Sequence, residues 1–182
     1  MKHIFYHLTA VMVVVVWGMT FISTKVLIVH GLSAQEIFLF RFLLAYAAVC
    51  PISFHRFFAR NLKDELYLVG GGVLGGSLFF FLQNIALGLT QASNVSFIIC
   101  MAPLLTAVLT VLSVRTEKVS RGFIYGSIIA LLGVGLLIFN GSFILRISPL
   151  GDLLTLLASL SWAFYSLVIR SLTRKYSPAF IT

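Results

Sequence analysis

Uncharged polar side chains recur at helical spacing inside the long apolar runs of this sequence. In the first run, Trp17, Thr20 and Thr24 are three and four residues apart, so they share one face of a helix. Two later runs repeat the pattern with Ser93, Ser96, Cys100 and Pro103, and with Thr155, Ser159, Trp162 and Ser166. Such faces either bind a polar solute or hydrogen-bond within and between helices as structural contacts.

Two adjacent amides, Gln83 and Asn84, end the third apolar run. Amide side chains are costly against lipid, so we expect both to face protein or water. Pro103 removes one backbone hydrogen bond and frees the carbonyl of Ile99 for another partner. We therefore predict a substrate pathway lined by Trp17, Thr20, Thr24, Gln83, Asn84, Ser96, Cys100, Pro103, Trp162 and Ser166.

Two basic residues lie within apolar runs. Arg41 stands about seven residues, roughly 10 Å, inside the second run. It either contacts an anionic group of a substrate or meets a structural partner such as the carbonyls of a helix end. Lys25 lies about four residues, roughly 6 Å, from the end of the first run. We expect its amine to reach the membrane interface while its stem lies along lipid.

The residue types needed for enzyme chemistry are scattered. The four histidines lie at the ends of the apolar runs or between them, and no run carries a central carboxylate. Cys50 and Cys100 lack metal-ligand spacing. We therefore predict no catalytic residues, no metal and no cofactor, and we expect that the protein is not an enzyme.

The elements that must position these residues are membrane-spanning helices. The chain has 182 residues, of which 60% are hydrophobic and 10% charged, whereas soluble domains carry about 25% charged residues. Six apolar segments are long enough to cross about 30 Å of hydrocarbon: 8–29, 34–54, 66–88, 92–114, 123–140 and 151–172. These segments predict an all-α polytopic membrane protein with six transmembrane helices.

Basic residues alternate between the two ends of these helices. Segments 1–7, 55–65, 115–122 and 173–175 carry lysine or arginine, whereas the opposite loops contain only Arg146. This bias predicts a cytoplasmic N-terminus. The net charge of +8 therefore reflects helix orientation, and we expect no nucleic-acid partner.

Glycines four residues apart occur in the third run, as Gly71 with Gly75 and Gly72 with Gly76. Small residues at this spacing let helices approach closely in lipid, so we predict that these glycines pack against another helix. Such pairs are also frequent in membrane helices without any packing role.

A short internal sequence similarity links the first and sixth runs. The segment WGMTFISTK (17–25) aligns with WAFYSLVIR (162–170), because tryptophan opens each and a basic residue follows eight positions later. Five helices separate the two copies, so they would cross the membrane in opposite directions. An odd-numbered repeat of this kind is typical of inverted-topology transporters.

The sequence resembles the EamA family of the drug/metabolite transporter superfamily. The resemblance rests on WG followed by small polar residues in the first run, on RFLLA (41–45), and on the segment 79–109. It implies a first five-helix repeat at 1–141, an external linker at 142–150, and a truncated second repeat at 151–182 that ends as a seventh helix begins. Full family members have ten helices in two such repeats.

The resemblance also implies a function. The chain would be an integral membrane transporter of small metabolites, such as amino acids or related compounds. It would export them by alternating access across a bacterial cytoplasmic membrane, with the lipid bilayer and a small-molecule substrate as its partners. The alternative is a half-length membrane interaction or structural unit that is inactive alone or works as a homodimer.

Overall fold

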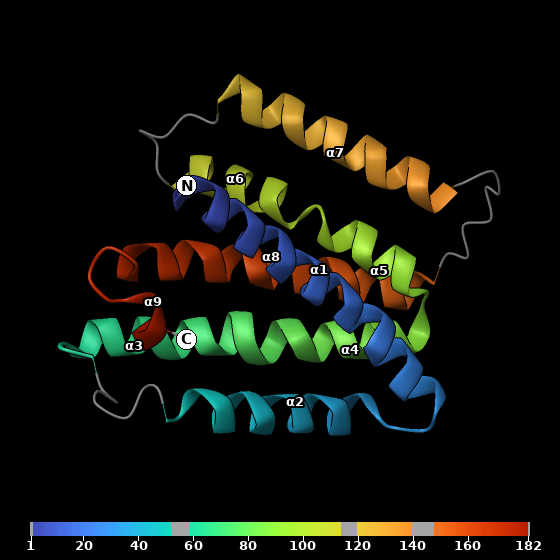
Figure 1. Ribbon diagram of the computed structural model, residues 1–182, viewed down its shortest axis with the longest axis horizontal. Coiled ribbons are helices and arrows are strands. Elements are labelled where there is room, and N and C mark those ends of the chain that lie inside the picture. Colours follow the sequence, from blue (N-terminus) through green and yellow to red (C-terminus); the bar gives the residue numbers. More distant parts are fainter. Residues whose placement is uncertain (1, 52–58, 114–119, 140–147, 182) are drawn as a thin grey trace.

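The computed structural model describes residues 2–51, 59–113, 120–139 and 148–181 (Figure 1). Within these ranges the chain forms helices and no strands, which confirms the predicted all-helical class. The helices are α1 (Lys2–Val29), α2 (Ala34–Val49), α3 (Leu62–Gly71), the π-helix η1 (Gly72–Leu78), α4 (Phe79–Leu89), α5 (Ala92–Ile99), α6 (Ala102–Ser113), α7 (Arg121–Phe139), α8 (Pro149–Leu172) and the short α9 (Pro178–Ile181).

Four helical segments are long and apolar enough to cross a membrane: Ile4–Val29, Leu62–Leu89, Ala92–Ser113 and Pro149–Leu172. The second joins α3, η1 and α4, and the third joins α5 and α6. These segments support a multi-pass membrane protein. Six crossings, a seventh helix and an inverted repeat stay predictions.

Local residue chemistry sets where two of the helices begin. The Ser33 hydroxyl accepts the backbone N–H of Glu36, and the Glu36 carboxylate accepts the backbone N–H of Ser33, which forms a capping box at α2. At α8, the Ser148 hydroxyl accepts the N–H of Gly151 and Pro149 occupies the first turn. Between α1 and α2, Gly31 adopts a left-handed φ of 99°, which glycine tolerates without strain.

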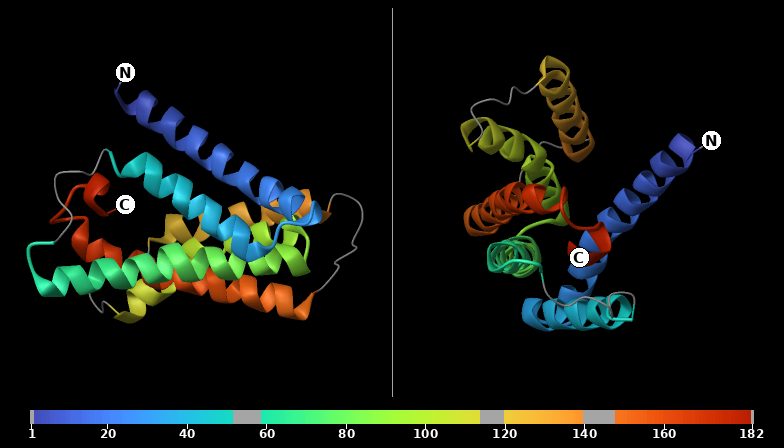
Figure 2. Two further views of the ribbon diagram at one scale, coloured as in Figure 1. Left: turned by 90° about the horizontal axis from the view of Figure 1, so that it is seen from below. Right: turned by 90° about the vertical axis from the view of Figure 1, so that its left-hand side faces the viewer.

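Helix α8 lies at the centre of the bundle, between the continuous helix α3–η1–α4 and the pair α5–α6 (Figure 1). Helix α2 runs beside α4 on the outer side, and α7 packs near α5 at the opposite edge. Helix α1 crosses this layer obliquely, and its N-terminal half points away from the other helices (Figure 2). The residues of α2, α4 and α8 therefore surround the place where α1 crosses.

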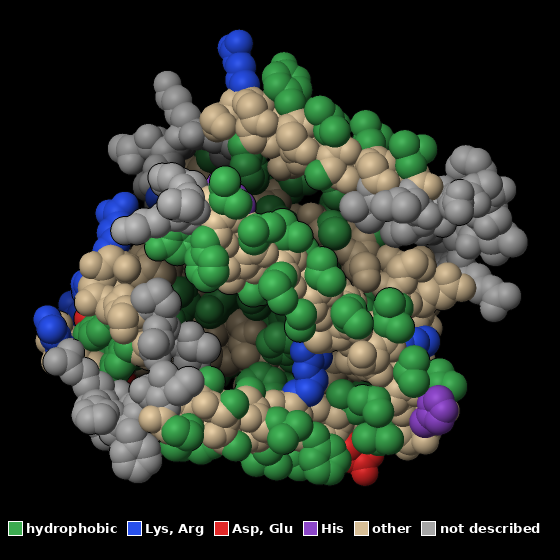
Figure 3. Space-filling view, viewed as in Figure 1, with side chains coloured by type: hydrophobic (Ala, Val, Ile, Leu, Met, Phe, Trp, Pro, Cys, Tyr) green, Lys and Arg blue, Asp and Glu red, His purple; other side chains and the backbone are tan. Residues whose placement is uncertain are grey.

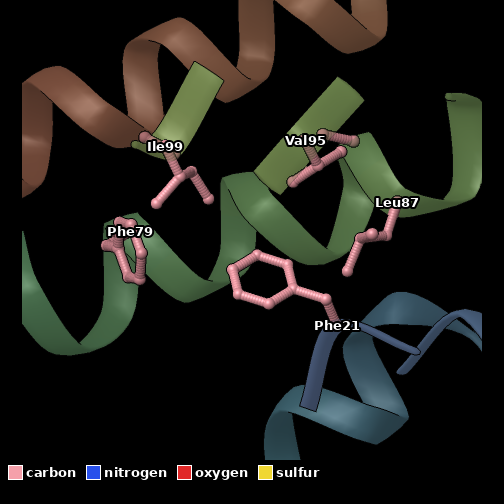
Figure 4. Close-up of a cluster of buried hydrophobic side chains, with 7 residues drawn as sticks. Phe21, Phe79, Leu87, Val95 and Ile99 are labelled. Carbon is pink, nitrogen blue, oxygen red and sulfur yellow. The ribbon is translucent and has the colours of Figure 1, made fainter. Parts of the chain in front are cut away.

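The buried apolar cluster sits where α1, α4, α5 and α8 meet. Five of its members, Phe21, Phe79, Leu87, Val95 and Ile99, converge from α1, α4 and α5 in Figure 4. Helix α8 adds Ala158, which is fully buried. Close packing of this kind holds helices together in lipid, where the hydrophobic effect contributes little to their association.

Two of the four predicted packing glycines lie directly against α8. A Cβ placed at Gly71 would lie 2.6 Å from Cδ1 of Ile169, and one at Gly75 would lie 2.5 Å from Cγ of Tyr165. Gly76 instead lies near Phe42 of α2, at an ordinary contact distance, and no described atom lies within 4 Å of the Cβ position at Gly72. The close approach of α8 therefore depends on two glycines.

The π-helical segment η1 interrupts the regular ladder of the longest helix. The N–H of Phe79 donates to the carbonyl of Leu74, five residues earlier. The same carbonyl accepts a hydrogen bond from the Ser161 hydroxyl of α8 at 2.8 Å. Along this helix the residues Gly71, Gly75, Phe79, Gln83 and Leu87 are all buried.

Candidate functional site

An aromatic cluster occupies the crossing of α1, α4 and α8. The ring centroids of Trp17 and Trp162 are 5.8 Å apart, and those of Phe79 and Trp162 are 4.9 Å apart. Tyr165 extends the cluster along α8, with its ring centroid 5.0 Å from that of Trp162. The structure thus brings the tryptophans of the two similar segments, Trp17 and Trp162, into contact.

Gln83 lies beside this cluster on α4, one helical turn beyond Phe79. Its side chain is fully buried, and neither Oε1 nor Nε2 has a hydrogen-bond partner among the residues that the structure describes. Leaving a buried polar group unpartnered costs about 1–3 kcal/mol. A polar ligand at this position would remove that cost, because the amide can donate and accept.

A second polar group lies between α2 and α4. The Asn84 side chain is fully buried; its Nδ2 donates to the carbonyl of Ala34 at 3.4 Å, while its Oδ1 has no partner in the described ranges. The guanidinium carbon of Arg41 lies 4.9 Å from the ring centroid of Phe80, and its buried Nη1 atom forms no hydrogen bond with any described residue. Helix-end carbonyls, the predicted structural partners of Arg41, do not bind it within the described ranges.

The surface of the molecule has a hollow between α1 and α2, which hydrophobic side chains border in Figure 3. Helix α4, which carries Gln83 and Asn84, packs against both of these helices. The two amides therefore lie on the helix that α1 and α2 share as a neighbour.

Three of the predicted pathway hydroxyls bond to their own helices. Thr20 donates to the carbonyl of Trp17 at 2.6 Å, Ser96 to Ala92 at 2.7 Å, and Ser166 to Trp162 at 2.9 Å. Thr24 is buried, with 2% of its surface exposed. The hydroxyl groups of Thr20, Ser96 and Ser166 therefore already donate to backbone carbonyls, although their oxygens can still accept a hydrogen bond.

Cys100 and Pro103 lie at the break between α5 and α6, and both are exposed. The structure therefore does not bring them to the aromatic cluster. Pro103 occupies the first turn of α6, where a missing N–H costs little. The carbonyl used across helices here is that of Ile98, which accepts from Ser159 of α8 at 3.3 Å.

The structure gives the amine of Lys25 two backbone partners, and its expected position at the membrane interface stays a prediction. Its Nζ donates to the carbonyls of Leu87 at 2.6 Å and Thr90 at 2.9 Å, at the end of α4. Carbonyls at a helix C-terminus lack partners within the helix and carry partial negative charge, so a cation stabilises them. The Thr90 hydroxyl in turn donates to Asp152 of α8 at 3.3 Å.

A second polar contact lies at the other end of the long helix α3–η1–α4, where the start of α3 meets the segment after α8. The buried carboxylate of Asp64 accepts from Lys175 Nζ at 2.8 Å and from the Tyr176 hydroxyl at 2.9 Å. The hydrogen bond to Asp64 raises the pKa of Lys175. Sequence patterns gave no signal for this contact, because more than a hundred residues separate its partners.

Within the described residues, no group of three or more histidine, cysteine, aspartate or glutamate side chains could hold a metal ion. In a comparison with known proteins, residues 4–139 match the family described as the EamA-like transporter family. No curated protein and no solved structure matches the chain.

Proposed function

The chain belongs to the EamA-like transporter family, and from this we propose that it carries a small metabolite through the centre of its helix bundle. The observation that carries the proposal is the buried amide of Gln83, which has no partner among the described residues and lies one helical turn beyond Phe79, the ring that contacts Trp162. Transport sites of this kind are mostly apolar, with a few polar groups that fix the orientation of the solute. The metabolites would be amino acids or related compounds, moved outward across a bacterial cytoplasmic membrane, with the N-terminus in the cytoplasm.

Alternating access is the proposed mechanism. A carrier of this type exposes its central site to one side of the membrane at a time. The Lys25–Thr90 and Asp64–Lys175 contacts join α1 and α3–η1–α4 to their neighbours at opposite ends of the long helix. Breaking these contacts in turn would open the two ends of the bundle alternately.

The test compares export by cells that make equal amounts of each variant. Gln83→Leu removes the unpartnered amide, whereas Gln91→Leu makes the same change at an exposed residue that forms no side-chain cap at α5. We expect the wild type and the Gln91 variant to enrich at least one small metabolite in the medium over an empty vector. We expect Gln83→Leu to lower that enrichment about tenfold.

Equal export by Gln83→Leu would refute the proposed role of Gln83. The absence of any enrichment by the wild type would count against export and would favour the second proposal, a structural or interaction unit of the membrane. In that case, crosslinking in membranes should capture a defined homodimer, while vesicles that contain the protein show no flux.

A further inference from the structure

Arg41 carries a positive charge inside the bundle without an anionic partner in the described part of the chain. Four of the five acidic residues are engaged elsewhere: Glu36 with Ser33, Asp64 with Lys175, Glu65 with the N–H of Ala59, and Asp152 with Thr90 and Ser148. The fifth, Glu117, lies outside the described residues. Arg41 is half-buried between α2 and α4, and a partly desolvated cation without a counterion favours binding of an anion.

We propose that Arg41 binds the carboxylate of the transported molecule, so that the substrate is a small organic acid. This inference rests on the proposed transport function. The face of Phe80 stabilises the guanidinium through a cation–π contact at 4.9 Å. The contact leaves Nη1 without an acceptor in the described part of the chain. The planar fork of an arginine matches the two oxygens of a carboxylate.

With α2 as the second of the predicted crossings, the depth of Arg41 favours a solute over a lipid headgroup as the source of the anion. The residue lies near the middle of α2, about 10 Å along the helix from Ala34 and about 12 Å from Val49. Lipid phosphates lie beyond about 15 Å from the midplane of a bilayer whose hydrocarbon is about 30 Å thick. At this depth the anion would therefore come from a bound solute.

Asn84 adds a second requirement to the ligand. Its Oδ1 is a buried acceptor that no described residue partners. Asn84 lies on α4 four residues, about 6 Å, beyond Phe80. An acceptor needs a donor, such as an ammonium or hydroxyl group of the bound molecule. Around them, Phe38 and Phe42 of α2 and Phe81 of α4 supply aromatic surface for an apolar body. The site therefore fits a monocarboxylate with an apolar body and a hydrogen-bond donor.

The test uses two matched pairs of probes: phenylalanine with phenylalaninamide, and 3-phenylpropionate with 3-phenylpropionamide. The members of each pair differ in the carboxylate, and only the first pair carries an amine. The full chain is placed in nanodiscs of phosphatidylcholine, which offers no net anionic lipid. The two tryptophans of the chain, Trp17 and Trp162, report binding through their fluorescence, because Trp162 packs against Phe79 next to Phe80.

We expect the wild type to bind at least one acid about ten times more tightly than its amide. Arg41→Met should bring this ratio close to one, and Arg41→Lys should retain part of it. Phe80→Leu keeps the cation and should preserve the preference for the acid with weaker binding. Arg174→Met, at an exposed arginine, should behave as the wild type. Size-exclusion elution and thermal unfolding check that each variant is folded.

The inference is overturned if the wild type binds acid and amide with equal affinity, or if it binds none of the four probes. An unchanged ratio of the two affinities in folded Arg41→Met would overturn it as well. A preference that returns only when phosphatidylglycerol replaces phosphatidylcholine would assign the site to lipid and would also overturn the inference.

The failure of the proposed function can be told apart from the failure of this inference. Arg41-dependent binding without export would leave the anion site standing, whereas export that is unaffected by Arg41→Met would leave transport standing without it.

Discussion

Replacing Gly75 with alanine tests how closely α8 approaches the long helix. A Cβ at this position would lie 2.5 Å from Cγ and 2.9 Å from Cδ1 of Tyr165. These atoms are at the root of the ring, so the side chain cannot relieve the overlap by moving its far end. The two helices must separate or Tyr165 must leave its rotamer.

The expected magnitude follows from two opposing effects. Overpacking costs typically about 1–3 kcal/mol, while alanine in place of glycine within a helix gains about 1 kcal/mol. The net loss is up to about 2 kcal/mol, which corresponds to a fall in Tm of up to roughly 8 °C for a chain of this size. Gly72→Ala is the matched control, because no described atom lies within 4 Å of its Cβ position, and its Tm should stay equal or rise.

Thermal unfolding of the purified protein in one detergent gives both shifts. A double variant, Gly75→Ala with Tyr165→Leu, should recover part of the loss relative to the sum of the single variants, because the ring that causes the overlap is gone. If Gly75→Ala and Gly72→Ala lower Tm equally, or if the two changes at 75 and 165 are additive, the steric reasoning is wrong.

Three further changes test the polar contacts. Lys25→Met should increase hydrogen exchange at the end of α4, because two carbonyls lose a charged donor, whereas Lys63→Met at an exposed position should not. Asp64→Asn should lower the free energy of unfolding at neutral pH. Because Asp64 raises the pKa of Lys175 in the folded protein, the difference in stability between wild type and variant should persist up to pH 10.5, the ordinary pKa of lysine. It should shrink as the pH rises through the higher pKa that Lys175 has in the folded state. Ser161→Ala should lower the free energy of unfolding by about 1 kcal/mol in a denaturant titration, through loss of its bond to a carbonyl of η1.

The helical class could be predicted because composition and apolar run length depend only on the chain itself. Helical spacing likewise pointed to Trp17 and Trp162, whose rings lie 5.8 Å apart in the structure. Their role in a substrate pathway stays a prediction, as does the role of Gln83 and Asn84. The burial of both amides agrees with the cost of exposing such groups to lipid.

The partner of Lys25 could not be predicted, since the carbonyls that it binds are more than sixty residues away in sequence. Depth within a run shows that a cation lies near a helix end, but it does not show whose helix end. Cys100 and Pro103 differ for another reason. Spacing of three and four residues defines one face only while the helix is continuous, and the chain breaks between α5 and α6 at that point.

The π-helical segment Gly72–Leu78 has a geometric consequence for the whole bundle. The buried positions 71, 75, 79, 83 and 87 are spaced by four residues, and each such step turns an α-helix by about 40° more than one full circle. Over the sixteen residues this drift would reach about 160°, enough to swing Gln83 and Leu87 away from α8. A π turn takes more residues to complete each circle. It therefore cancels much of this rotation and keeps the five buried positions on one side of the helix. Deleting a single residue from 72–78 would therefore act at a distance, by rotating every later side chain of α4 about its axis.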